Sequence, residues 1–215
     1  MNVFVLGGFL GSGKTTILLQ LAAYLNNISR GGQSGSSLPR LVILENEIGD
    51  EGIDDKVIRA EGYHVEVMTV GCICCLMLGT LIMMVERIQE ELHPDWLIIE
   101  ATGVADTTTI VRTLEYRMPE LGGVSGVVVA DAERYDLLMD NIPGFIKGQL
   151  MHADAIMLNK IDLLDPRQRK EIEGKLDGLR SSASLRFSVT AVEPIDHHVW
   201  KELVKQNEQL ANAGF

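Results

Sequence analysis

The chain has 215 residues, of which 46% are hydrophobic and 23% charged, a balance typical of a globular protein with a sizeable core. Its 30 acidic residues exceed its 19 basic residues, and the formal net charge of -11 disfavours binding to nucleic acid or to an anionic membrane. The N-terminus lacks the features of a signal peptide, and no apolar run approaches the roughly 20 residues that span a bilayer. We therefore expect a cytoplasmic protein without a nucleic-acid or membrane partner.

Short apolar runs rich in valine and isoleucine alternate with longer amphipathic stretches, which predicts a mostly parallel sheet covered by helices. A flexible loop rich in glycine and serine is expected at residues 29–39. The expected strands span residues 2–6, 41–44, 65–70, 96–99, 126–130, 155–158 and 186–189. The expected helices span residues 14–26, 78–91, 107–118, 146–151, 166–179 and 196–212.

The first expected strand runs into GFLGSGKT, residues 8–15, which matches the phosphate-loop pattern G-x-x-x-x-G-K-[ST] and opens a helix. Backbone N–H groups of such a loop cradle phosphates, Lys14 would hold the outer phosphates, and the Thr15 hydroxyl would bind Mg²⁺. A glycine-rich turn without a ligand is the alternative, but the strand before it and the helix after it favour an α/β, three-layer P-loop NTPase fold. The expected nucleotide contacts in this segment are Gly8, Gly11, Ser12, Gly13, Lys14, Thr15 and Thr16.

All 3 cysteines lie in four consecutive positions, as Cys72, Cys74 and Cys75, directly after an expected strand. Because ligands of open parallel sheets bind beyond the carboxyl ends of the strands, the cysteines would share an edge with the nucleotide. A closed zinc site usually takes four ligands from two separated pairs, whereas this run fits a site that accepts and hands on Zn²⁺, Co²⁺, Ni²⁺ or Cu⁺. A redox role and buried structural thiols stay open. Candidates for the fourth ligand are water, a partner, Glu45, Glu47, Asp50 and Glu51.

The strand expected at residues 96–99 ends in Glu100, and Gly103 follows three positions later. An acid at this place can hold the Mg²⁺ shell, and a glycine can bring its N–H to the γ-phosphate. A solvated acid at a strand end would explain the segment alone equally well. We expect Lys14, Glu100 and Gly103 to be catalytic, with Thr15 and Glu100 as the Mg²⁺ ligands.

The apolar run AIML leads into Asn159, Lys160, Ile161 and Asp162. Guanine offers N1–H and its 2-amino group along one edge, whereas adenine presents an acceptor at N1, so the carboxylate of Asp162 should select guanine. A site of this kind discriminates by a factor of about 10⁴ or more. A capped strand-to-helix turn could carry the same residues, but the phosphate loop beside it favours GTP and GDP as ligands, with Asn159, Lys160 and Asp162 as the expected nucleotide-binding residues.

The segments GGFLGSGKTT, ENEIG followed by GID, GCICC, IIEATGVAD, VVVADA and LNKIDL occur in this order between Val3 and about Leu164. Together they resemble the CobW-like GTPases, which are relatives of the nickel-inserting GTPases of hydrogenase and urease maturation. The resemblance implies a GTPase that delivers metal, with a nucleotide-responsive switch near residues 46–49. It also implies that Thr190 and Ala191 back the guanine base. The transition-metal ligands expected on this basis are Cys72, Cys74, Cys75 and Glu47.

The chain also departs from typical members of this family. They continue into a second domain, whereas this chain ends at Phe215, so we expect a single P-loop GTPase domain over residues 1–215, with the C-terminal CobW-type domain absent. After GCICC many relatives carry an arginine and an acid, but here the sequence is LMLGTL, and Thr107 stands where a proline is usual. These changes bear on the hand-off of metal and on the client.

The function expected from these features is a GTP-hydrolysing metallochaperone that couples its nucleotide state to transfer of Zn²⁺, or of Co²⁺ or Ni²⁺, to a client protein. Neither an arginine finger nor a water-orienting glutamine can be assigned, so hydrolysis should be slow without a partner. A nucleotide-dependent homodimer is one form that a partner could take. Two alternatives stay open: a GTPase that activates a cobalamin-dependent or other cofactor-dependent enzyme, with structural cysteines, and a nucleotide-gated binding module.

Overall fold

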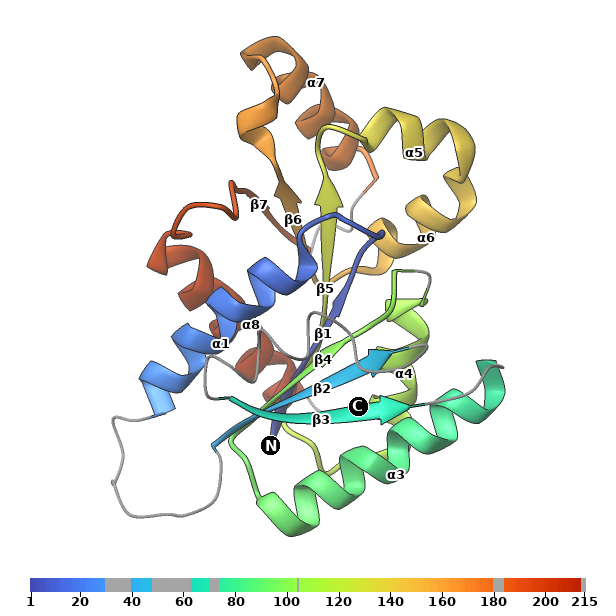
Figure 1. Cartoon of the computed structure of the whole chain (residues 1–215), viewed down its shortest axis with the longest axis vertical. Coiled ribbons are helices and arrows are strands. Elements are labelled where there is room, and N and C mark those ends of the chain that lie inside the picture. Colours follow the sequence, from blue (N-terminus) through green and yellow to red (C-terminus); the bar gives the residue numbers. More distant parts are fainter. Residues whose placement is uncertain (30–39, 48–62, 70–73, 104, 180–183, 214–215) are drawn as a thin grey trace.

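The computed structural model describes residues 1–29, 40–47, 63–69, 74–103, 105–179 and 184–213. Within these ranges, seven strands form a sheet in the order β3-β2-β4-β1-β5-β6-β7, and every pairing is parallel (Figure 1). The α/β architecture predicted from the sequence is confirmed. The strands are β1 (Asn2–Gly7), β2 (Leu41–Glu47), β3 (His64–Thr69), β4 (Trp96–Glu100), β5 (Val124–Asp131), β6 (Ala155–Asn159) and β7 (Leu185–Ser188).

The helices of the described ranges include all six that the sequence predicted, with shifted ends, and one further α-helix and one short 3-10 helix that it did not predict. The unpredicted α-helix is α5, which has seven residues and no side-chain hydrogen bond at its N-cap. None of the helices described here has both the length and the apolar character needed to cross a membrane. They are α1 (Lys14–Ser29), α3 (Cys74–Leu92), α4 (Thr107–Arg117), α5 (Tyr135–Asn141), α6 (Pro143–His152), the 3-10 helix η1 (Ile161–Leu163), α7 (Pro166–Asp177) and α8 (His197–Ala213).

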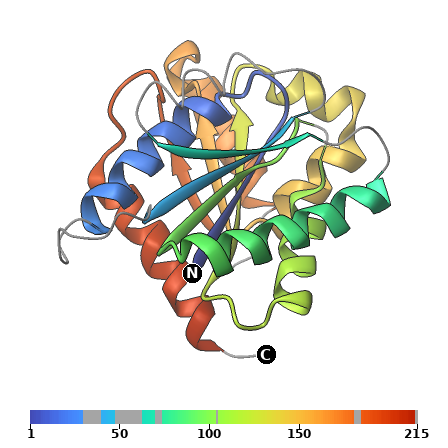
Figure 2. The ribbon, with the colours of Figure 1, turned by 60° about the horizontal axis from the view of Figure 1, so that its bottom comes forward.

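Central strand β1 shows how the sheet divides its side chains between two helical layers. Phe4 and Leu6 point to the face covered by α1 and α8, whereas Val3 and Val5 point to the face covered by α3 and α4. Figure 2 shows these helix pairs on opposite sides of the sheet. Because both faces are covered, β1 is a continuous apolar run instead of an alternating one, which is typical of a parallel strand.

The β5–β6 part of the sheet is covered by α5, α6 and α7, on the same side as α4. Ile156 and Leu158 of β6 pack with Ile146 of α6 and Leu176 of α7, and all four side chains are buried. This third cluster holds β5 and β6 in place, and these two strands lead into the acidic and amide side chains described below.

Helix α8 is attached to the sheet by Asn207, a polar side chain that is fully buried. Its Nδ2 lies 3.0 Å from the carbonyl oxygen of Val3, 3.2 Å from that of Gly123 and 2.8 Å from the hydroxyl of Ser125. Burying an amide costs free energy unless it finds partners, and here the partners belong to β1, to β5 and to the residue before β5. The last described helix is thus tied to the first strand.

Candidate functional site

The parallel register brings polar residues to one edge of the sheet, at the carboxyl ends of neighbouring strands. Glu100 of β4 pairs with Leu6 of β1 on one side and with Glu45 of β2 on the other. Asp131 of β5 pairs with Asn159 of β6 in the same way. Ligands of open parallel sheets bind at this edge, so the structure places the sequence motifs where a ligand could meet them together.

The loop between β1 and α1 has the backbone conformation that its glycines permit. Gly8, Gly11 and Gly13 have φ values of 134°, 73° and 94°, which side-chain-bearing residues rarely adopt. At Gly13 a Cβ atom would also overlap Nδ2 of Asn159. Lys14 opens α1, and the first N–H groups of a helix have no acceptor within the helix, which makes this end suitable for an anion.

A hydroxyl and a carboxylate from distant parts of the sequence meet beside this loop. The Thr15 hydroxyl donates a hydrogen bond of 3.1 Å to Oε1 of Glu100, at the end of the strand next to β1. Oxygen ligands of this kind suit Mg²⁺, which prefers one or two protein oxygens in addition to phosphate and water. The chemistry of the pair therefore fits the ion predicted from the sequence.

The segment after β4 also touches the phosphate loop. A Cβ atom added at Gly103 would lie 2.8 Å from the backbone nitrogen of Leu10 and 3.2 Å from its Cα. Glycine therefore allows the two backbones to approach closely. Thr107, which stands at the family's usual proline position, begins α4 and packs its buried side chain against the Cα of Gly7.

Asn159 joins the phosphate loop to the loop that follows β7. Its Nδ2 donates to the carbonyl oxygen of Ser12 at 2.9 Å, and its Oδ1 accepts from the backbone N–H of Ala191 at 2.9 Å. The side chain is 3% exposed. Both polar ends of the amide thus face protein groups, so the geometry favours a bracing role in which Asn159 sets the distance between the phosphate side and the base side.

Lys160 and Asp162 leave β6 in different directions. Lys160 has a left-handed backbone conformation, with φ of 64°, and its Nζ donates to Oδ2 of Asp131 at 2.8 Å. Asp162 lies in η1 with its side chain exposed. An exposed carboxylate at this edge is accessible to the N1–H and 2-amino groups of a guanine.

Asp131 carries the charge that organises this side of the site. Burial raises the pKa of its carboxyl, but hydrogen bonds from Lys160 and Arg134 outweigh that effect and hold the pKa below its ordinary value of 3.8. The side chain is fully buried, and its two ion pairs, with Arg134 and Lys160, favour the ionised carboxylate.

Gln20 is a site-supporting residue that the sequence reasoning missed. Its Nε2 donates to the carbonyl oxygens of Ala191 and Glu193 at 2.8 and 3.0 Å, and its Oε1 accepts from the N–H of Ile195 at 2.8 Å. A glutamine in the middle of α1 thus holds the loop that contains Thr190 and Ala191. No motif in the sequence identifies it, because its partners lie more than 170 positions away.

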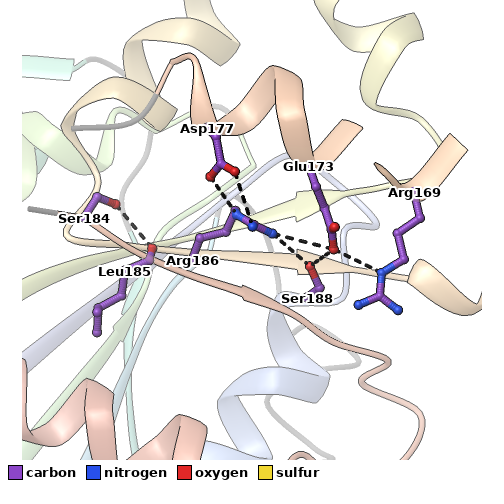
Figure 3. A network of polar contacts seen from close by, with 7 residues as sticks. All are labelled: Arg169, Glu173, Asp177, Ser184, Leu185, Arg186 and Ser188. Atoms are coloured by element: carbon purple, nitrogen blue, oxygen red, sulfur yellow. Dashed lines mark hydrogen bonds and ion pairs between the residues drawn. The ribbon is translucent and has the colours of Figure 1, made fainter. Parts of the chain in front are cut away.

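Strand β7 leads into this loop and is held against α7 by a network of charged groups (Figure 3). The Ser188 hydroxyl donates to Oε1 of Glu173 at 2.5 Å, and Arg186 donates to Asp177 from Nε at 3.0 Å. Glu173 also accepts from Arg169 at 3.0 Å. The hydrogen bond from Ser188, supported by the arginines, lowers the pKa of Glu173 despite some burial. The network therefore fixes the direction in which the chain enters the base-side loop.

The predicted transition-metal ligands lie at the ends of the described ranges or outside them. Cys72 is outside the described residues, and of Cys74, Cys75 and Glu47 the structure describes the backbone alone, at the start of α3 and the end of β2. The side chains that the structure does describe contain no group of three or more His, Cys, Asp or Glu able to hold a metal. The cysteine site therefore stays a prediction.

A parallel α/β sheet whose central strand enters a glycine-rich loop, with a hydroxyl and a carboxylate meeting beside that loop, defines a P-loop nucleotide-binding domain. The family model described as "CobW/HypB/UreG, nucleotide-binding domain" matches residues 2–186. The chain belongs to this family, and the resemblance drawn from the motifs is confirmed.

Two characterised relatives show how much of a longer protein this chain corresponds to. The zinc chaperone YjiA of Escherichia coli strain K12 is 31% identical over 171 residues, which cover 75% of this chain and 49% of the relative. The zinc-regulated GTPase metalloprotein activator 1 of Dictyostelium discoideum is 28% identical over 236 residues, covering 91% and 47%. The chain thus spans about half the length of these relatives.

Solved structures share the fold at low sequence identity. HypB from Helicobacter pylori in complex with nickel has a TM-score of 0.64 and 18% identity, covering 98% of this chain and 89% of that one. The Zn(II)-bound YjiA GTPase from E. coli has a TM-score of 0.57 and 23% identity, covering 92% and 60%. At these identities the likeness establishes a common three-layer architecture.

Proposed function

We propose that this chain binds GTP with Mg²⁺, hydrolyses it slowly, and couples the nucleotide state to binding and transfer of a transition metal. The observation that carries the nucleotide part is the contact between the Thr15 hydroxyl and the Glu100 carboxylate beside the phosphate loop. These two oxygens belong to the helix and the strand that a P-loop protein uses to hold Mg²⁺ against phosphate. Membership of a family described as a nucleotide-binding domain supports the same proposal.

Each residue of the site has a role in this proposal. Backbone N–H groups of the phosphate loop and Lys14 hold the phosphates, and Gly103 brings its N–H toward the γ-phosphate. Thr15 and Glu100 would hold Mg²⁺, which when bound supplies positive charge for the developing charge on the phosphates. Asp162 accepts hydrogen bonds from guanine.

The base-side loop, which carries Thr190 and Ala191, lies behind the base in this proposal. Gln20 and Asn159 hold the backbone of this loop at Ala191, and the Figure 3 network fixes the strand that leads into it. The site would thereby be shaped for a flat purine before the ligand arrives.

The metal part of the proposal rests on the cysteine run and on the relatives' names. Cys72, Cys74 and Cys75 can supply three thiolates, and Glu47 is the proposed fourth ligand. Two relatives are named as a zinc chaperone and a zinc-regulated GTPase metalloprotein activator, which supports Zn²⁺ as the cargo ahead of Co²⁺ or Ni²⁺. We place the activity in the cytoplasm, in a single domain over residues 1–215, with a metalloprotein as client.

An anaerobic titration tests this function. The reduced protein is titrated with Co²⁺ and Zn²⁺ with GDP or a non-hydrolysable GTP analogue bound, while thiolate-to-cobalt absorption is followed. We expect a stoichiometric signal whose midpoint differs between the two nucleotides. The variant with all three cysteines changed to serine should lose the signal. His64→Ala, at an exposed position outside the proposed ligand set, should keep it.

The possible results separate the parts of the proposal. Equal metal affinities in the two nucleotide states rule out the coupling. A protein that binds GTP but gives no thiolate signal in either state loses its metal role. If the triple-serine variant also still activates its client, the activator of a cofactor-dependent enzyme becomes the better account. A protein that binds no guanine nucleotide contradicts the whole proposal.

A further inference from the structure

Arg134 connects the phosphate loop to the buried carboxylate of Asp131. Its Nε donates to Oδ2 of Asp131 at 2.7 Å, its backbone N–H donates to Oδ1 at 3.2 Å, and a terminal nitrogen donates to the carbonyl oxygen of Leu10 at 2.7 Å. Lys160 donates from Nζ to the same Oδ2 atom of Asp131 at 2.8 Å. One carboxylate therefore joins the phosphate loop to the segment proposed to read the base.

The side-chain contacts of Arg134 are not explained by a role in starting helix α5. It is the N-cap residue of α5, but its side chain makes no capping hydrogen bond and reaches instead to Leu10, 124 positions earlier in the sequence. Its side chain is 33% exposed, whereas that of Asp131 is fully buried. The guanidinium is thus held by an ion pair with Asp131 on one side and donates a hydrogen bond to the phosphate loop on the other.

The contact with Leu10 has a geometric consequence for the next residue. In a trans peptide the carbonyl of one residue and the N–H of the following residue point in opposite directions in one plane. Holding the carbonyl of Leu10 on the Arg134 side therefore turns the N–H of Gly11 to the other side of the loop. A Cβ atom at Gly11 would lie 3.2 Å from Arg134, so the guanidinium packs closely against this peptide.

We propose that Arg134 is a positioning residue for nucleotide phosphates, and that Asp131 fixes the positions of the Arg134 and Lys160 side chains. Arg134 holds the Leu10–Gly11 peptide so that an N–H faces the β- and γ-phosphates of a guanosine di- or triphosphate. Asp131 holds both cations, so its loss disturbs the phosphate side and the base side at once. This inference rests on the proposed function, because it takes a guanine nucleotide as the ligand.

Paired nucleotide affinities test the inference on the full chain. GDP and inosine diphosphate differ only in the 2-amino group, so the ratio of their affinities reports base reading, and the GDP affinity itself reports the phosphate contacts as well. Arg134→Ala should weaken GDP binding by about tenfold or more, the range expected for loss of a charge-assisted hydrogen bond, and leave the ratio within about twofold of wild type. The GDP affinity of Arg134→Lys should fall between those of wild type and Arg134→Ala, because a single ammonium group cannot reach both Asp131 and Leu10 as the forked guanidinium does.

Asp131→Asn should lower both the GDP affinity and the ratio, because it releases Lys160 as well. Arg87→Ala removes an exposed arginine–carboxylate pair with Glu91 on α3, outside the proposed nucleotide contacts, and serves as the matched control, with wild-type affinity and ratio expected. Urea unfolding of each variant shows whether it is folded under the binding conditions.

Two results overturn the inference alone: wild-type GDP affinity in Arg134→Ala, or a parallel loss of affinity and ratio in that variant. A wild-type protein that binds neither nucleotide overturns the proposed function, and this inference with it.

Discussion

Asp131 gives the site a pH dependence whose sign follows from its surroundings. Burial raises the pKa of this carboxyl, but Lys160 and Arg134 hold the folded-state value below 3.8. A depressed pKa means that the ionised carboxylate stabilises the folded state above pH 3.8, and that this stabilisation is lost as the pH falls through the folded value. Asp131→Asn should therefore cost about 1 to 3 kcal/mol in urea unfolding at pH 7, and less below the ordinary pKa.

A matched control for this measurement is Asp140→Asn, at an exposed position in α5, which should change little. Parallel pH profiles for wild type and Asp131→Asn would show that the carboxylate contributes no pH-dependent stability.

Asp162 allows a test of base selection by exchange of hydrogen-bonding groups. Asp162→Asn replaces an acceptor by an amide that both accepts and donates, and such a side chain suits xanthine, which has an oxo group where guanine has its 2-amino group. We expect GTP affinity to fall by about 100-fold and xanthosine triphosphate to bind better than GTP. Competition binding with both nucleotides measures this, and an unchanged preference for GTP would remove Asp162 from the base site.

The residues of the site differ in how far the sequence could predict them. The meeting of Thr15 and Glu100 was predictable, because a phosphate-loop pattern and the end of a parallel strand both place their residues at the same edge. Gln20 and Arg134 were not, because each contacts backbone atoms more than 100 positions away, and no local pattern encodes such a contact.

Among the elements, two helices differ from the sequence predictions, one in where it begins and one in not being predicted at all. The helix predicted at residues 78–91 begins four residues earlier in the structure, at Cys74. The prediction missed this first turn because it placed the cysteines between the strand and the helix. Helix α5 was missed because it has seven residues and its N-cap is Arg134, a residue type that seldom caps helices. Strands were easier, since a strand buried on both faces is a short apolar run bounded by polar residues.

Helix α8 should depend strongly on one amide. Asn207→Ala leaves the carbonyl oxygens of Val3 and Gly123 and the hydroxyl of Ser125 without this buried donor. We expect a loss of about 1 to 3 kcal/mol in the free energy of unfolding by urea. Asn212→Ala, on the exposed side of the same helix, removes a contact within the helix and should cost less than about 0.5 kcal/mol. Equal effects would mean that Asn207 does not anchor the helix.

At the scale of the whole molecule, the phosphate loop carries an apolar tip. Leu10 is 74% exposed between Arg134 and Gly103, and Leu137, one turn after Arg134, is 61% exposed. Exposed apolar side chains beside a nucleotide site are the kind of surface that a partner buries. We therefore predict that GTP hydrolysis per molecule rises with protein concentration, as a second copy covers this surface.

Sedimentation with GDP and with a GTP analogue provides the independent measurement, and Leu10→Ser should reduce the concentration dependence. Constant activity per molecule, together with a monomer in both nucleotide states, would rule out the homodimer.

The position of β1 at the centre of the sheet has a consequence for protein synthesis. The phosphate loop follows directly after β1, but Leu6 of β1 is paired with Glu100 and Val127, which a ribosome adds much later. At about 5 to 20 residues per second, the nascent chain would wait roughly 6 to 25 s between completing β1 and completing β5. Until β4 is complete the apolar strand β1 has neither of its neighbours, and until β5 is complete it has one of the two. Nucleotide binding can begin only after more than half of the described chain has left the ribosome.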